Sequence, residues 1–363
     1  MIAPTPKSGL MNIQPYKQGQ YASGPNARCI KLSSNENPHG PSPKAREAFA
    51  QASLDMHRYP DGSCSALRQA LAEVHAIDAD RIVCGAGSDE LLGLIIHAYA
   101  GPGDEVLFTE HAFLMYKIYT FSAGATPVEA KEINLRADVD LLLAAVTPKT
   151  KLVLIANPNN PTGSYLTNAE LVRLREGLPH HVILAIDAAY AECVTAPDCG
   201  DGKSLVEATD NTVMMRTFSK VYGLPALRLG WMYGPSAIVD AMNRARSPFN
   251  VSSTAQAVGI AAVRDTAYTA AQTQINAKSL QSLSEAVSAL GYHVYPSQCN
   301  FILVDFASAE TAHAMNAHLL SQGIYVRDVK SYKLPTCLRI TVGTEEENHV
   351  LIEAMQHFAA QAA

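Results

Sequence analysis

Two nearly continuous apolar runs, at residues 151–156 and 182–187, constrain the fold of this 363-residue chain more than any other feature. Runs this uniform are typical of parallel strands covered on both faces, because a strand with one solvated face alternates apolar and polar residues. Thr167 and Glu170, between the two runs, form a capping pattern that predicts a helix start. Further strands are predicted at 81–84, 105–108 and 212–218, in alternation with helices at 43–56, 63–75 and 88–100. This order predicts an α/β fold, with a mostly parallel sheet flanked by helices.

The pattern changes near residue 252, where longer helices and shorter strands replace the regular alternation. Helices are predicted at 267–290, 309–322 and 345–361, and strands at 300–304, 324–326 and 338–342. We interpret this part as a second, smaller α+β domain. The large domain is expected at 46–249, and the small domain is expected to combine the N-terminal arm (1–45) with residues 250–363.

Composition excludes several classes of protein. Hydrophobic residues make up 48% and charged residues 17%, as in ordinary globular proteins, and no uncharged apolar run reaches the roughly 18 residues of a membrane-spanning helix. The net charge of −6 argues against nucleic acid or an anionic membrane as a partner, although it is compatible with a local basic pocket. The seven cysteines show no C-x-x-C spacing, and the chain starts without an apolar signal segment. We therefore expect no disulfide framework, no metal site and a cytoplasmic location.

Four polar segments follow predicted strands, at the ends where open α/β sheets bind their ligands. The first reads Gly-Ala-Gly-Ser-Asp-Glu at 85–90, between a strand and a helix. Backbone N–H groups at such a helix start suit a phosphate, but a tight turn capped by Ser88 would have the same sequence. Glu90 stands where the dinucleotide fingerprint requires a third glycine, which weakens a Rossmann interpretation.

The other three segments carry an amide, a carboxylate and an amine. Residues 157–163 read Asn-Pro-Asn-Asn-Pro-Thr-Gly, a rigid turn directly after an apolar strand. Asp187 ends the next apolar strand, and a buried carboxylate there requires either a structural salt bridge or a cationic ring nitrogen. Lys220 is either a solvated surface residue or an amine with a lowered pKa, which suits Schiff-base chemistry. Together the segments supply what pyridoxal 5′-phosphate requires: a phosphate site, an acidic partner for the ring nitrogen and a lysine.

On these segments the chain resembles the class II aminotransferases of fold type I, which depend on pyridoxal 5′-phosphate, and among them the histidinol-phosphate aminotransferases. The matching segments run almost from end to end, at 32–41, 58–62, 85–92, 157–163, 187–190, 218–230 and 337–343. The combination of Asn-Asn-Pro-Thr-Gly, Ser-Lys and a late Leu-Arg-Ile is highly specific. Ala188 departs from the family, which commonly carries Glu there, but that position does not pair with the ring nitrogen.

The resemblance implies roles for the matching residues around the cofactor. Lys220 forms the Schiff base and shuttles a proton between the substrate α-carbon and the cofactor, and Asp187 pairs with the ring nitrogen. Asn160 and Tyr190 bond the 3′-oxygen of the ring. Phe113 stacks on the ring, and Tyr59 reaches the phosphate from a neighbouring subunit, which implies a homodimer. The residues implied around the cofactor phosphate are Ser88, Asp89, Thr217, Ser219 and Arg228.

The resemblance also implies the substrates. Arg339 would bind the carboxylate of glutamate or 2-oxoglutarate as a bidentate pair, and the phosphate of histidinol phosphate in the other half-reaction. Arg327 and Tyr16 match residues that help bind that phosphate, although such residues near strand ends are also common on surfaces. The implied reaction interconverts L-histidinol phosphate and 2-oxoglutarate with imidazole acetol phosphate and L-glutamate.

Three alternative functions stay open at this point. The first is the same chemistry on aromatic amino acids, phenylalanine or tyrosine. The second is a decarboxylase of the same fold that acts on a phosphorylated amino acid. The third, a cofactor-sensing regulator without enzymatic activity, is disfavoured because the arm before residue 31 is too short for a DNA-binding segment.

Overall fold

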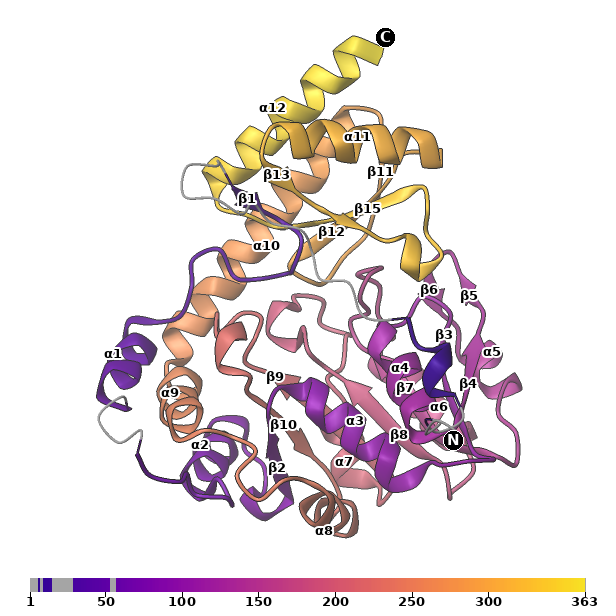
Figure 1. Cartoon of the computed structure of the whole chain (residues 1–363), viewed down its shortest axis with the longest axis vertical. Coiled ribbons are helices and arrows are strands. Elements are labelled where there is room, and N and C mark those ends of the chain that lie inside the picture. The colour runs from indigo at the N-terminus through magenta and orange to yellow at the C-terminus, as the bar shows by residue number, and fades with distance from the viewer. Residues whose placement is uncertain (1–5, 7–8, 15–28, 53–56, 363) are drawn as a thin grey trace, which may run out of the picture.

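A seven-stranded sheet forms the centre of the computed structural model, which describes residues 6, 9–14, 29–52 and 57–362 (Figure 1). The strands lie in the order β2 (Ile82–Gly85), β10 (Gly230–Tyr233), β9 (Thr212–Thr217), β8 (Ile183–Asp187), β7 (Thr150–Ala156), β3 (Glu105–Thr109) and β4 (Thr126–Ala130). Neighbours from β9 to β4 are parallel, whereas β10 is antiparallel to both β2 and β9. The prediction of a mostly parallel sheet is confirmed.

Helices cover both faces of this sheet, which is why β7 and β8 are apolar throughout (Figure 1). In β7, Leu152 and Leu154 enter the core on one face, and Val153 and Ile155 enter the core on the other. One face packs against α3 (Ser88–Tyr99), α4 (Leu114–Ala123) and α8 (Ser236–Ala245). The other packs against α1 (Pro43–Ala52), α2 (Ser65–His75), α5 (Val139–Ala144), α6 (Asn168–Gly177), α7 (Lys203–Ala208) and α9 (Ser253–Arg264). The predicted capping box at Thr167 and Glu170 is present at the start of α6.

A smaller antiparallel sheet lies at the other end of the molecule (Figure 1). Its strands are β11 (His293–Tyr295), β12 (Phe301–Asp305), β15 (Cys337–Thr341) and β14 (Arg327–Asp328). It packs against α10 (Thr266–Ala289), α11 (Ala309–Ser321) and α12 (Glu345–Ala362) around a separate apolar core. Strand β1 (Ile30–Lys31) pairs with β13 (Ile324–Tyr325), so the N-terminal segment joins this part. The predicted smaller α+β unit is confirmed.

Helix α10 connects the two parts, running from the large sheet to the small one (Figure 1). The division into 46–249 and the rest stays a proposal. Helix α9, which follows that boundary in the sequence, packs with α1 and α2 in a core of the large sheet, where Ala255, Val258 and Ala262 share one apolar cluster with Leu67 and Leu71. No helix in the described ranges combines the length and the hydropathy needed to cross a bilayer.

Candidate active site

The four polar segments meet at one edge of the central sheet. Gly85, Ala156, Asp187 and Thr217 are the last residues of β2, β7, β8 and β9. Strands β7, β8 and β9 are parallel, and β2 shares their direction because β10 is antiparallel to both of its neighbours. Their carboxyl ends therefore open on the same side. A residue of the small sheet reaches this edge as well, because Arg339 of β15 donates a hydrogen bond to Asn160 Oδ1. The four segments therefore converge at one edge of the sheet, and the cleft between them stays an expectation.

The start of α3 is shaped to receive an anion. Gly87 is the N-cap with a φ of 86°, and no side chain caps the helix, so the alternative role of Ser88 as a structural cap does not hold. Strand β10 passes so close that a Cβ on Gly230 would lie 2.2 Å from the Ser88 nitrogen. Glycine at 87 and 230 thus leaves room for the close approach of Arg228 and β10, and the start of the 12-residue helix has no side-chain cap.

Hydroxyl groups and a guanidinium surround this helix start. Arg228 Nη1 donates to Ser219 Oγ at 3.4 Å, and a Cβ on Gly87 would lie 2.5 Å from Arg228 Nη2. Thr217 Oγ1 donates to Ser219 Oγ at 3.0 Å. In the first turn, burial raises the pKa of Asp89, an effect that Tyr119 and Arg228 partly offset. A cation, hydroxyls and a helix N-terminus at one place suit a phosphate group.

Asp187 is buried and keeps one carboxylate oxygen for a ligand. Its Oδ2 accepts a hydrogen bond from the Tyr116 hydroxyl at 2.9 Å, whereas its Oδ1 accepts none from any described residue. Burial raises the pKa of Asp187 to about 6, with the Tyr116 bond partly offsetting the rise. No described lysine, arginine or histidine lies within ion-pair distance, so the structural salt bridge considered above is absent from the described part of the chain. An orphaned buried oxygen is costly and fits a cationic ring nitrogen as its partner.

Tyr116 was not predicted as a site residue, although its spacing from Phe113 in the sequence indicates that the two side chains lie together. It lies in α4, three residues after Phe113, the N-cap of that helix, and residues at this spacing share one side of a helix. The two rings meet edge to face, with centroids 5.9 Å apart. Phe113 is thus placed beside the Tyr116–Asp187 pair, as expected for a residue that stacks on a bound ring.

Lys220 lies in the turn after β9, which is closed by a hydrogen bond from the Gly223 N–H to the Lys220 carbonyl at 2.9 Å. Its Nζ is 5.4 Å from the centroid of the Tyr190 ring. Protein surrounds the amine although the side chain keeps partial exposure, and this burial, together with the charge of Arg339, lowers the pKa of Lys220 to about 8. The residue is therefore no ordinary surface lysine. A neutral amine at this place is nucleophilic and can accept a proton.

Arg339 is buried with its guanidinium held from two sides. Nη1 donates to Asn160 Oδ1, Nη2 donates to the Ser33 carbonyl at 2.8 Å, and Nε has no partner among the described residues. In the β14–β15 pair Arg327 stands directly opposite Arg339. Directly opposed residues of antiparallel strands project on the same face, so the side chains of Arg327 and Arg339 leave the small sheet on one side.

Two expected residues are not brought into the site. Tyr59 is 84% exposed and stacks on Phe249, with ring centroids 4.7 Å apart. Within one chain it does not reach the phosphate cradle, which is compatible with the expected contribution from a neighbouring subunit. Tyr16 lies outside the described residues. A further residue, Asn35, was missed: it is buried and donates a hydrogen bond to the Tyr190 hydroxyl at 2.8 Å.

Comparison with known proteins identifies the family to which the chain belongs. A profile of the aminotransferase class I and II family matches residues 27–355, and the chain belongs to this family. The histidinol-phosphate aminotransferase of Paramagnetospirillum magneticum is 52% identical over 99% of each chain, and that of Rhodospirillum centenum is 49% identical over 98% of each. The crystal structure of the histidinol-phosphate aminotransferase from Sinorhizobium meliloti, in complex with pyridoxal 5′-phosphate, is similar with a TM-score of 0.88 and 30% identity, over 93% of this chain and 92% of that one.

The family depends on pyridoxal 5′-phosphate, and the residues of this chain fit that cofactor. The orphaned Oδ1 of Asp187 matches a protonated ring nitrogen. The helix start at Gly87 and Ser88, which no side chain caps, matches the phosphate together with Arg228 beside it. The amine of Lys220, with its lowered pKa, matches the aldehyde. The chain is therefore an aminotransferase that uses this cofactor.

Proposed function

We propose that the enzyme transfers the amino group of L-histidinol phosphate to 2-oxoglutarate, yielding imidazole acetol phosphate and L-glutamate. The observation that carries this proposal is the opposed pair of Arg327 and Arg339 on β14 and β15. Two guanidinium groups on one face suit a phosphate dianion in one half-reaction and the carboxylates of 2-oxoglutarate in the other. Full-length similarity to histidinol-phosphate aminotransferases at about 50% identity supports it.

The charged groups of the site would hold the cofactor. When bound, pyridoxal 5′-phosphate supplies an aldehyde that takes up amino groups and a ring that delocalises electrons. Asp187 would accept the ring N–H through Oδ1 and keep that nitrogen protonated, while Asn160 and Tyr190 would bond the 3′-oxygen. Phe113 would stack on the ring. The residues that would hold the phosphate are Ser88, Thr217, Ser219 and Arg228, with Asp89 acting through its backbone N–H.

Lys220 and Arg339 would act on the substrate. Because its pKa is lowered to about 8, a fraction of Lys220 is neutral near pH 7, and its Nζ would accept the proton from the substrate α-carbon and hold it for return. Arg339 binds the carboxylate of glutamate or 2-oxoglutarate, and Asn160 and Ser33 fix the orientation of its guanidinium. Both half-reactions use this one site in turn, which gives ping-pong kinetics.

A ranking of amino donors tests the substrate. The purified enzyme is titrated with histidinol phosphate, phenylalanine and tyrosine while the cofactor absorbance and kcat/KM are recorded. We expect kcat/KM for histidinol phosphate to exceed that for phenylalanine or tyrosine by more than about tenfold. Arg327→Ala should lower its kcat/KM by about 10- to 100-fold, because a charge-assisted contact to phosphate is lost, and should change the glutamate half-reaction less.

Arg327→Lys, which keeps the charge, is the matched control and should retain more activity than Arg327→Ala. A tenfold advantage of an aromatic donor would instead identify an aromatic amino-acid aminotransferase. Release of carbon dioxide without any need for 2-oxoglutarate would identify a decarboxylase. An equal loss of both half-reactions in Arg327→Ala would contradict the phosphate role.

We also propose a homodimer in which each subunit completes the site of the other, in the cytoplasm, where the seven free thiols would stay reduced. Tyr59 and Phe249 form an exposed aromatic pair, which single chains seldom leave uncovered. Beside the phosphate cradle an open groove is lined by Ala86, Gly93 and Arg228, among others. A second copy that covers this groove would bring Tyr59 to the phosphate.

Complementation between two impaired variants tests this arrangement. Lys220→Ala and Tyr59→Ala chains are unfolded and refolded together, and activity is compared with that of each variant alone. If Tyr59 acts across the interface, a mixed dimer has one intact site, so about a quarter of all sites should be restored. Activity that never exceeds the average of the two variants would place Tyr59 within its own subunit, and a monomer by light scattering would contradict the dimer.

A further inference from the structure

Asn35, in the segment between β1 and α1, joins the two parts of the molecule beside the active site. It is 1% exposed, and its φ of 54° is left-handed, which asparagine tolerates better than most residues. Its Nδ2 donates to the Tyr190 hydroxyl at 2.8 Å, and its Oδ1 accepts from Thr341 Oγ1 at 3.1 Å. A single side chain thus connects β15 of the small sheet with the loop after β8.

The orientation of the Asn35 amide follows from Thr341. Thr341 Oγ1 accepts the backbone N–H of Asn35 at 2.9 Å and donates its one proton to Asn35 Oδ1 at 3.1 Å. The amide oxygen therefore faces Thr341, and the amide nitrogen faces Tyr190. The backbone cannot easily turn away, because the Asn35 carbonyl accepts a hydrogen bond from Asn300 Nδ2 at 2.9 Å.

This orientation decides which way the phenol proton points. An amide nitrogen only donates, so the Tyr190 oxygen accepts and its own proton needs another acceptor. No described residue accepts that proton. Burial holds the pKa of Tyr190 well above its usual value, with Arg339 partly offsetting the rise, so the hydroxyl stays protonated.

We propose that Asn35 is a positioning residue, which makes Tyr190 a hydrogen-bond donor to the 3′-oxygen of the bound cofactor. The proposal rests on the proposed placement of that oxygen at Tyr190 and Asn160. A phenol that accepts a hydrogen bond is a stronger donor, because bonds in a chain polarise one another. Donation to the 3′-oxygen stabilises its anionic form, so it favours loss of the proton that the lysine-bound cofactor carries.

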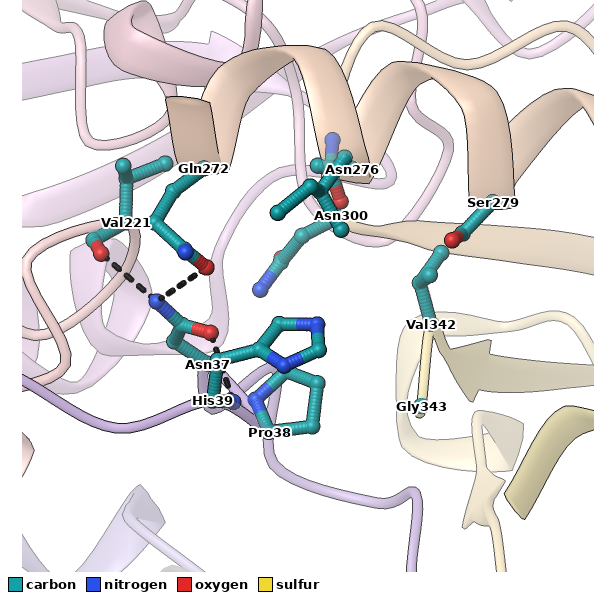
Figure 2. Close-up of a pocket in the computed structure, with 11 residues that line it drawn as sticks. Asn37, Pro38, His39, Val221, Gln272, Asn276, Ser279, Asn300, Val342 and Gly343 are labelled. Atoms are coloured by element: carbon teal, nitrogen blue, oxygen red, sulfur yellow. Dashed lines mark hydrogen bonds between the residues drawn. The ribbon is translucent and has the colours of Figure 1, made fainter. Parts of the chain in front are cut away.

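The segment that carries Asn35 is fixed to both substrate-handling residues. The carbonyl of Ser33 accepts from Arg339 Nη2 at 2.8 Å. Asn37 Nδ2 donates to the carbonyl of Val221, next to Lys220, at 2.8 Å, and to Gln272 Oε1 on α10 at 3.3 Å (Figure 2). These contacts fix the position of the Asn35 segment relative to Arg339 on one side and to the Lys220 turn on the other.

The pH dependence of the cofactor absorbance tests the proposal. The charged and titratable groups that face Tyr190 and Lys220 are Arg339, Asp187, Tyr116, Tyr332, Cys193, Cys299 and Glu36, whereas Asn35 hydrogen-bonds to Tyr190, Thr341 and Asn300. We expect Asn35→Ala to raise the absorbance midpoint by about 0.5–1 pH unit, the equivalent of one hydrogen bond. Tyr190→Phe should raise the midpoint at least as much. Adding Asn35→Ala to Tyr190→Phe should then leave the midpoint of the single variant unchanged.

Thr341 provides the matched pair of controls. Thr341→Ser keeps the orienting hydroxyl and should keep the wild-type midpoint, whereas Thr341→Val removes it and should shift the midpoint in the same direction as Asn35→Ala. Thermal melting monitors folding, and Thr341→Val carries the test if Asn35→Ala does not fold. The proposal is overturned if Asn35→Ala leaves the midpoint unchanged while Tyr190→Phe moves it, or if Asn35→Ala has the same effect in both backgrounds. A wild-type enzyme that takes up no pyridoxal 5′-phosphate would instead overturn the proposed function.

Discussion

Replacing Lys220 with alanine is expected to lower kcat for transamination by about 10⁴-fold or more, because one side chain supplies both the covalent link and the proton transfer. The cofactor should also become removable by gel filtration, since only non-covalent contacts would hold it. Steady-state assays with 2-oxoglutarate and absorbance spectra of the desalted protein measure both effects. Small primary amines added to the variant should restore part of the activity, because they replace the missing base.

Two further measurements sharpen this prediction. Lys278, on the exposed side of α10, provides the control, and Lys278→Ala should keep full activity. In the cofactor-free wild type only the neutral amine attacks an aldehyde, so uptake of pyridoxal 5′-phosphate should accelerate about tenfold per pH unit and level off near the Lys220 pKa of about 8. Full turnover by Lys220→Ala would refute the assignment of this lysine.

Replacing Asp187 with asparagine is expected to lower kcat by about 10²- to 10⁴-fold. Asparagine can still accept the Tyr116 hydrogen bond but carries no charge to keep the ring nitrogen protonated. Asp187→Glu, which keeps the charge, is the control and should retain more activity than Asp187→Asn. The absorbance spectrum of the loaded protein and single-turnover rates with glutamate measure the loss. Equal activities of Asp187→Asn and the wild type would contradict the proposed pairing.

Asp187→Asn should also stabilise the cofactor-free protein at neutral pH. Burial raises the pKa of Asp187 from 3.8 to about 6, so the folded state prefers the neutral carboxyl. Stability from this group is fully present below the unfolded pKa and is lost as the pH rises through about 6. At pH 7.5 removal of the charge should therefore raise the free energy of unfolding, by on the order of 1–3 kcal/mol. Urea titrations of Asp187→Asn and the wild type at pH 4.5 and 7.5 measure the difference in unfolding free energy. An equal difference at both pH values would contradict a raised pKa of Asp187.

Much of the fold could be predicted because the signals are local. The apolar runs of β7 and β8 reflect helices on both faces, and the capping box at Thr167 is a contact between neighbours in the sequence. Strand β10 was missed, because its four residues are too few to show a hydrophobic period and its pairing with β2 joins segments more than 100 residues apart. The close approach of Gly230 to Ser88 depends on the position of β10 between β2 and β9.

By itself, the sequence determined which chemical groups the cleft contains: the cradle at Ser88, the amide of Asn160, the carboxylate of Asp187 and the amine of Lys220. Each ends or follows a predicted strand, and parallel strands bring their carboxyl ends to one edge. Only the tertiary structure decided how these groups are tuned. The orphaned Oδ1 of Asp187, the lowered pKa of Lys220 and the donor role of Tyr190 depend on burial and on partners from distant segments such as Tyr116, Arg339 and Asn35. Solvent exclusion and hydrogen-bond direction arise when segments pack together, and no local pattern of residue types encodes them.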